Sequence, residues 1–170
     1  MHGFKNGSVF LKELCVNNDV VFVQEHWLLR SHLYKLSDID DNFCLFGKSA
    51  MDNIQSTGIL TGRPFGGVGV LWRKSLGSVI SSVDCSEDGR VVVIKIEHGS
   101  SNLLCFGVYL PCYDHSAEYP NELQLITGYI ESVLIGMRAM HQLFQATSTL
   151  NVALITKALM YSLVSSKNIT

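Results

Sequence analysis

The stretch "VVFVQEHWLL", residues 20–29, does most to decide the fold. Its first four residues are apolar, and Gln24 and Glu25 follow them without a break. An apolar run of this length predicts a short strand that is buried on both faces. Glu25 then stands at the end of a rigid strand, which is where sites in layered α/β proteins collect. Its carboxylate is either a solvated or helix-capping group, or a ligand for a hard cation such as Mg²⁺.

The composition indicates one folded domain. The chain has 170 residues, of which 47% are hydrophobic and 16% are charged, and this is ample material for one core. The formal net charge of −2 excludes a global basic field that would attract nucleic acid, although a local basic groove is compatible with it. The first ten residues contain no long apolar segment, so we expect no signal peptide.

The five cysteines form no C-x-x-C pair, and several lie in apolar runs. This usage predicts a reducing intracellular compartment, nucleus or cytoplasm, and no disulfide partner. The longest apolar-rich stretch, residues 150–164, contains Thr156 and Lys157. It is shorter than the roughly 18–20 residues of a membrane span. We therefore expect no membrane partner.

Strands and helices alternate along the chain in a recognisable order. Strand-like runs occupy residues 43–46, 67–72, 79–83, 91–96 and 103–110, with short polar turns between them. Short turns predict antiparallel pairs. Helical spacing of apolar residues follows the Asn6-Gly7-Ser8 cap, covers residues 27–36 and returns after Pro120. This order predicts an α/β fold with packed, mostly antiparallel sheets and helices outside.

The last part of the chain differs in composition. No Asp or Glu follows Glu131, and the rhythm of strands and turns stops. We predict one domain over residues 1–134 and a separate helical tail over residues 135–170, unrelated in origin or frameshifted. The expected junction lies near residues 134–136.

Tyr109 and Arg90 are the other candidate site residues. Tyr109 ends an apolar strand, where a phenol either contacts a phosphate oxygen or lies at the sheet edge in water. Arg90 follows the Asp88-Gly89 turn, where it either binds phosphate or pairs with a nearby acid. Gly66-Gly67 predicts a turn or a close backbone approach. The six histidines show no spacing typical of zinc ligands.

Taken together, four stretches resemble the endonuclease/exonuclease/phosphatase superfamily, in particular the endonuclease domain of LINE-type non-LTR retrotransposons. They are "VVFVQEHWL", "GGVGVLW", "DGRVVVIKI" and "CFGVYLPCYD", followed by the helix "YPNELQLITGYIESVL". The likeness covers residues 3–134 and lies in the order and spacing of the motifs. It implies a partial four-layer α/β sandwich and Mg²⁺- or Mn²⁺-dependent cleavage of the DNA phosphodiester backbone.

The resemblance also implies a role for each candidate residue. Glu25 matches the family's metal-ligand glutamate, Tyr109 matches a tyrosine that contacts the scissile phosphate, and Arg90 matches the arginine of a Gly-Arg turn. The asparagine of the family's first strand, its "GDxN" block and its Ser-Asp-His motif have no counterpart here. Because these motifs supply the water-activating Asp and the His–Asp pair, we expect a truncated nuclease fragment that is inactive alone.

Two other functions stay open at this point. The first is a phosphatase or sphingomyelinase-like branch of the same superfamily, because the missing half would carry the substrate loops. The second is a non-catalytic interaction module that uses the apolar tail as a partner helix, with an unknown protein partner.

Overall fold

The computed structural model describes residues 3–52, 63–111, 118–143 and 149–156. The described helices are α1 (Phe4–Asn17), α2 (Tyr34–Ser37) and α4 (Tyr119–Leu143), with 3₁₀ turns η1 (Arg30–His32) and η2 (Lys74–Leu76). The described strands are β1 (Val20–Gln24), β2 (Phe43–Lys48), β3 (Val68–Arg73), β4 (Ile80–Cys85), β5 (Val91–His98), β6 (Ser101–Val108) and β7 (Thr149–Thr156).

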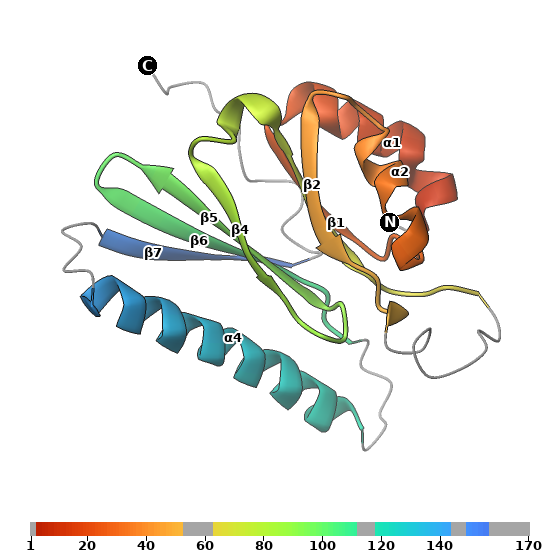
Figure 1. Ribbon diagram of the computed structural model, residues 1–170. Coiled ribbons are helices and arrows are strands. Elements are labelled where there is room, and N and C mark those ends of the chain that lie inside the picture. Colours follow the sequence, from red (N-terminus) through yellow and green to blue (C-terminus); the bar gives the residue numbers. More distant parts are fainter. Residues whose placement is uncertain (1–2, 53–62, 112–117, 144–148, 157–170) are drawn as a thin grey trace.

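The strands form two sheets (Figure 1). The first has the order β1-β3-β2 and is antiparallel, with Val20 opposite Trp72 and Gln24 opposite Val68. The second has the order β4-β5-β6-β7; its first three strands form an antiparallel meander, and β7 runs parallel to β6. The long helix α4 lies between β6 and β7 in the chain and supplies the crossover that a parallel pair needs.

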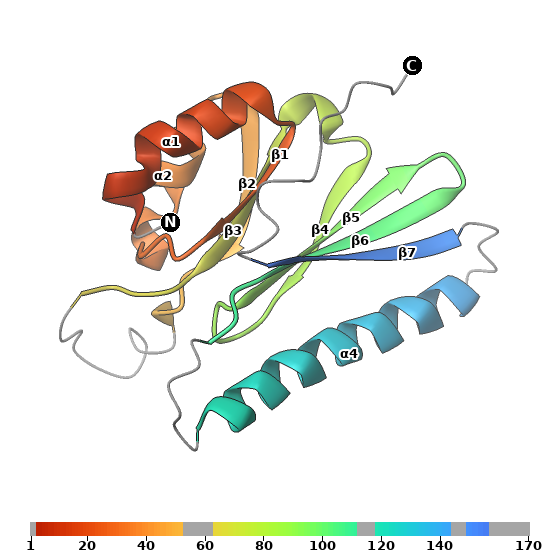
Figure 2. The ribbon, with the colours of Figure 1, turned by 180° about the vertical axis from the view of Figure 1, so that it is seen from behind.

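Four layers result from how these elements bury their apolar faces. α1 and α2 cover the outer face of the first sheet, the two sheets face each other, and α4 covers the outer face of the second (Figures 1 and 2). Leu11 and Cys15 of α1 pack with Val21 of β1. Phe22 instead points between the sheets, and Ile126 of α4 packs on the second sheet. Consecutive strand residues face opposite sides, so β1 contributes to two cores at once.

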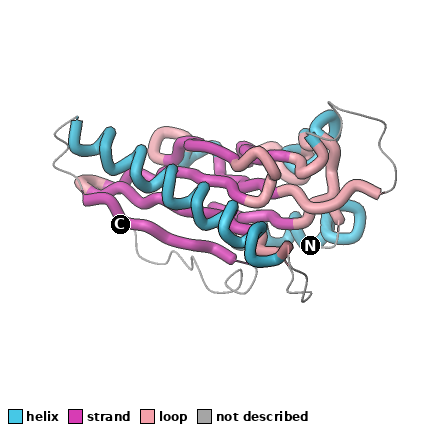
Figure 3. The backbone as a smooth tube through the Cα atoms, turned by 90° about the horizontal axis from the view of Figure 1, so that it is seen from below, coloured by secondary structure: helices cyan, strands magenta, loops and turns pink. Residues whose placement is uncertain are grey.

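This architecture confirms the predicted fold class, an α/β sandwich of mostly antiparallel sheets with helices outside. β1 is buried on both faces as expected, since only Val20 at its start is partly exposed. Seen from below, α4 runs obliquely across the strands of the second sheet (Figure 3). The strand ends at one edge of both sheets, after β1 and β6, come together and position the candidate site.

The prediction of a wholly helical tail is wrong for residues 149–156, because they form β7 at the edge of the second sheet. Four of its eight residues are β-branched, and β6 offers a free ladder of backbone partners. The expected junction at residues 134–136 lies inside α4, where Val133, Leu134 and Met137 all pack on the sheet. An unrelated origin of residues 135–170 stays a prediction; residues 157–170 lie outside the described residues.

Two predicted helices also differ in detail. Residues 27–36 do not form one continuous helix, because η1 and α2 are separate short turns that begin at Arg30 and Tyr34. The first helix begins at Phe4 rather than after the Asn6-Gly7-Ser8 cap, and Gly3 at its N-cap makes no side-chain capping bond. The backbone N–H of Phe4 instead donates to the carbonyl of His26, so tertiary contact fixes this helix start.

The described cysteines Cys15, Cys44, Cys85 and Cys105 are free thiols, while Cys112 lies outside the described residues. Burial raises the pKa of Cys15 and of Cys105 to about 11, because desolvation disfavours the thiolate. These thiols therefore act as small apolar side chains. In the part of the chain that is described, none of the helices has the length and apolar character of a membrane span.

Candidate functional site

The turn that follows β1 holds Glu25 in an unusual backbone conformation. Glu25 and Trp27 both have φ of 56°, in the left-handed region that side-chain-bearing residues rarely adopt. The N–H of Glu25 donates to the carbonyl of Gly67 at 2.9 Å, and the N–H of Trp27 donates to that of Gly66 at 3.0 Å. On the other side, the N–H of Gly3 donates to the carbonyl of Glu25 at 3.1 Å. Strained residues held in this way concentrate at functional sites.

His26 is the buried anchor of this turn. Its Nδ1 accepts a 3.0 Å hydrogen bond from the N–H of Leu28, and its Nε2 lies 3.1 Å from the carbonyl oxygen of Lys48. These partners assign a neutral ring with its proton on Nε2. Burial lowers the pKa of His26 to about 4, because desolvation disfavours the imidazolium. A Cβ atom on Gly67 would overlap this ring, so Gly67, with φ of 85°, is required by both conformation and space.

Glu25 and Tyr109 meet across the two sheets. The hydroxyl of Tyr109 donates a hydrogen bond of 2.7 Å to Oε1 of Glu25, although the two residues are 84 positions apart. The neighbouring residue Gln24 makes a parallel link, because its Nε2 donates to the carbonyl oxygen of Val108 at 2.8 Å. The ends of β1 and β6 are therefore tied together by two adjacent pairs. The sequence candidates Glu25 and Tyr109 lie in direct contact.

Arg90 reaches the same place from the turn between β4 and β5. Its Nη2 donates to Oε2 of Glu122 in α4 at 3.1 Å, and its Nε lies 3.9 Å from Oδ2 of Asp88. Its Cζ lies 5.5 Å from the centre of the Tyr109 ring, a cation–π distance. The structure thus brings together all three candidates named from the sequence: Glu25 bonds to Tyr109, and Tyr109 packs against Arg90.

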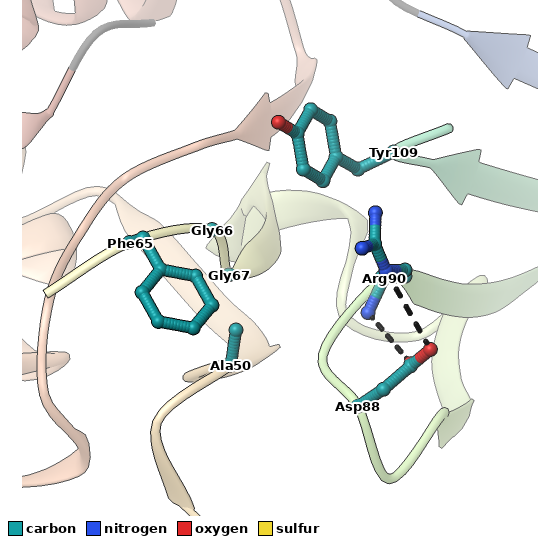
Figure 4. A pocket seen from close by; sticks show the side chains of 7 residues that line it. All are labelled: Ala50, Phe65, Gly66, Gly67, Asp88, Arg90 and Tyr109. Carbon is teal, nitrogen blue, oxygen red and sulfur yellow. Dashed lines mark hydrogen bonds and ion pairs between the residues drawn. The ribbon is translucent and has the colours of Figure 1, made fainter. Parts of the chain in front are cut away.

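A pocket of about 230 Å³ opens beside these residues (Figure 4). Tyr109 and Arg90 contribute from the second sheet, whereas Phe65 to Gly67 and Ala50 contribute from the loops of the first. Phe65 is 54% exposed at its rim. An arginine, a phenol and an exposed ring around one hollow suit an anionic ligand that carries a flat group. The lining residues are Ala50, Phe65, Gly66, Gly67, Asp88, Arg90 and Tyr109.

The oxygen donors of the site fit a hard cation that takes most of its coordination shell from water and a bound phosphate. Within the described ranges, no group of three or more His, Cys, Asp or Glu side chains is placed to hold a metal ion. Mg²⁺ commonly takes one or two carboxylates from a protein and completes its shell with water and substrate phosphate. Glu25 fits this pattern as one rigid oxygen donor, because its turn and Tyr109 fix its position.

Several site residues have no recognisable signal in the sequence. The anchoring role of His26 depends on Lys48 and Gly67, which are distant in sequence, and the spacing of the histidines addresses only a zinc site. The local sequence gives no hint that Phe65 or Glu122 belongs to the site. Phe65 precedes a glycine turn, and Glu122 lies in an amphipathic helix. The prediction of a turn or a close backbone approach at Gly66-Gly67 is confirmed, since both residues have positive φ and their carbonyls accept hydrogen bonds from Trp27 and Glu25.

Solved structures of other proteins share this four-layer fold. The structure is similar to that of the 3′ phosphatase NExo from Neisseria bound to a product DNA hairpin, with 13% identity and a TM-score of 0.51, covering 80% of this chain and 49% of that one. It is also similar to the AP endonuclease LMAP from Leishmania major, with 14% identity and a TM-score of 0.54, covering 77% of this chain and 43% of that one.

A third structure, the 3′-5′ exonuclease NExo from Neisseria meningitidis, is similar with 14% identity and a TM-score of 0.50, covering 80% of this chain and 50% of that one. The chain thus spans about half the length of the solved structures that it matches. No family model matches the sequence, and no curated protein matches it.

Proposed function

We propose that the pocket beside Glu25 and Tyr109 binds a phosphodiester of DNA together with a divalent cation, Mg²⁺ or Mn²⁺. The observation that carries this proposal is the 2.7 Å bond from Tyr109 to Glu25, with Arg90 stacked on the same phenol ring. Structures of the same fold include a phosphatase bound to a DNA hairpin and an AP endonuclease. The sequence motifs resemble those of LINE-type endonucleases, so we propose a retrotransposon-type nuclease as the origin.

Each residue has a distinct part in this proposal. Glu25 contributes a carboxylate oxygen to the cation, which when bound would neutralise charge on the phosphate and orient a water molecule. Arg90 offers planar N–H donors to phosphate oxygens. Tyr109 has a single proton to donate, and in this structure Glu25 accepts it. A phosphate oxygen that accepts this proton would replace Oε1 of Glu25 as the acceptor.

We further propose that these 170 residues cleave DNA weakly or not at all. The sequence lacks counterparts of the "GDxN" and Ser-Asp-His motifs, which the resemblance assigns to water activation. A site that binds a metal and a phosphate but has no general base lacks a contribution to the cleavage rate that is typically 10²–10⁴-fold. The free thiols of the described cysteines support a reducing compartment as the place of action.

The test is binding of a fluorescently labelled DNA duplex, followed by anisotropy with Mg²⁺ and with EDTA. We expect Mg²⁺ to tighten binding by the wild-type chain and Glu25→Gln to remove this dependence. Glu13→Gln on the exposed surface of α1 is the matched control and should behave as wild type. Binding that ignores both Mg²⁺ and Glu25→Gln would refute the proposed site.

Cleavage is tested separately with supercoiled plasmid. We expect no nicking above the background of the Glu25→Gln variant in Mg²⁺ or Mn²⁺. Nicking by the wild-type chain that Glu25→Gln abolishes would show that the chain is active, contrary to the proposed inactivity. Hydrolysis of sphingomyelin to phosphocholine, or release of phosphate from inositol phosphates, without DNA binding would favour the other branch of the superfamily.

A further inference from the structure

The guanidinium of Arg90 already has an anionic partner in this structure. Glu122 projects from the first turn of α4, and its Oε2 accepts the 3.1 Å hydrogen bond from Nη2 of Arg90. Arg90 lines the pocket and has a side chain that is 25% exposed, and Glu122 is 42% exposed. A carboxylate and a phosphate bind arginine through the same planar pairing of N–H donors with oxygens. Glu122 therefore stands where an anionic ligand of Arg90 would bind.

Charge around the pocket opposes an incoming anion. Two carboxylates, those of Asp88 and Glu122, contact the guanidinium of Arg90, and a third, that of Glu25, accepts the hydrogen bond from Tyr109. These negative charges repel an incoming phosphate, and dissolved salt screens the repulsion mainly where the carboxylates are exposed. A phosphate thus has to displace one carboxylate or arrive with a cation.

Asp88 and Glu122 are not equally replaceable. Oδ1 of Asp88 accepts hydrogen bonds from the hydroxyl of Ser86 and from the N–H of Arg90, so it closes the turn before β5. Glu122 has no such task, because in the described part of the chain its carboxylate contacts only Arg90. Partly exposed ion pairs contribute little stability, so a ligand can exchange with Glu122 at small cost.

We propose that Glu122 is a built-in competitor that occupies the anion-binding edge of Arg90 until a phosphate group displaces it. This inference rests on the proposed function for the chemical class of the ligand. It adds that α4 sets the affinity of the pocket for phosphate. Displacement of Glu122 leaves Arg90 stacked on Tyr109 and directed toward the ligand.

Titration of the full chain with inorganic phosphate, without metal or DNA, tests the inference. Amide chemical shifts of Gly67 and Gly89 report binding, because both glycines lie beside the pocket. We expect Glu122→Gln to bind phosphate roughly threefold to tenfold more tightly than wild type, since it removes the competitor and one negative charge. Glu131→Gln, an exposed site farther along α4, is the matched control and should not change the affinity.

A second arm isolates Arg90 as the group over which Glu122 and phosphate compete. In an Arg90→Gln background, Glu122→Gln should no longer alter phosphate affinity. The inference is overturned if Glu122→Gln binds phosphate as weakly as wild type or more weakly. It is also overturned if neither wild type nor Glu122→Gln binds phosphate at millimolar concentration. Because this assay uses neither Mg²⁺ nor DNA, its failure leaves the Mg²⁺-dependent binding of DNA as a separate result.

Discussion

The hydroxyl of Tyr109 lies 2.7 Å from Oε1 of Glu25 and donates its proton to that carboxylate. Tyr109 follows β6 of one sheet, and Glu25 follows β1 of the other. The bond therefore fastens the two sheets at the edge where the pocket opens. It also gives the carboxylate of Glu25 a defined orientation, which a metal ligand needs before the metal arrives.

Loss of this hydroxyl should be measurable in stability. Tyr109→Phe keeps the ring on Arg90 but removes the donor to Glu25. We expect a loss of about 1–2 kcal/mol in the free energy of unfolding, because a hydrogen bond to a charged group is lost. Urea denaturation measures the change. Tyr34→Phe, an exposed tyrosine of α2, is the control; equal stability of Tyr109→Phe and wild type would contradict the expected contribution.

Gly67→Ala should lower the free energy of unfolding far more than Gly99→Ala. Gly67 and Gly99 both have positive φ, but a Cβ atom at Gly67 overlaps the ring of His26, whereas nothing lies within 4 Å of one at Gly99. We expect Gly99→Ala to cost about 1 kcal/mol from backbone strain and Gly67→Ala about 3 kcal/mol or more. Thermal unfolding compares the two. Similar costs would mean that the turn moves to accept the extra methyl group.

Acid should weaken the fold through His26. In the unfolded chain a histidine binds a proton near its ordinary pKa of 6.5, whereas burial lowers the pKa of His26 in the folded chain to about 4. The unfolded state therefore binds more protons between these values, and stability falls as pH drops from about 6.5 toward 4. The full loss is on the order of 3 kcal/mol.

The measurement is the free energy of unfolding between pH 7.5 and pH 4. His26→Gln should flatten the part of the decline that this residue causes. His98→Gln, at the exposed end of β5, is the control and should keep the wild-type slope. A wild-type slope in His26→Gln would assign the acid sensitivity to other groups.

Sequence and structure agree where local pattern controls the outcome. The apolar runs between polar turns predict β1 to β6 because each strand buries at least one face, as Val21 and Phe22 do on opposite sides of β1. The same runs place Glu25 and Tyr109 at strand ends, and the packed sheets bring these two residues together.

Long-range contacts explain what the sequence did not reveal. The positive φ of Glu25 depends on the carbonyl of Gly67 and the N–H of Gly3, and neither leaves a pattern near residue 25. β7 depends on pairing with the free edge of β6, a contact that the local sequence does not show, although four β-branched residues favour a strand there. The contact of Glu122 with Arg90 spans 32 positions and follows from where α4 docks.

We propose above all that Glu25, oriented by Tyr109, is a ligand of a divalent cation beside the pocket. Paramagnetic broadening of amide resonances by substoichiometric Mn²⁺ tests it most directly, in wild type and in Glu25→Gln. We expect the amides of Gly67, Arg90 and Tyr109 to broaden first in wild type and to stay sharp in Glu25→Gln. Broadening that is centred elsewhere, or that persists unchanged in Glu25→Gln, would contradict the claim.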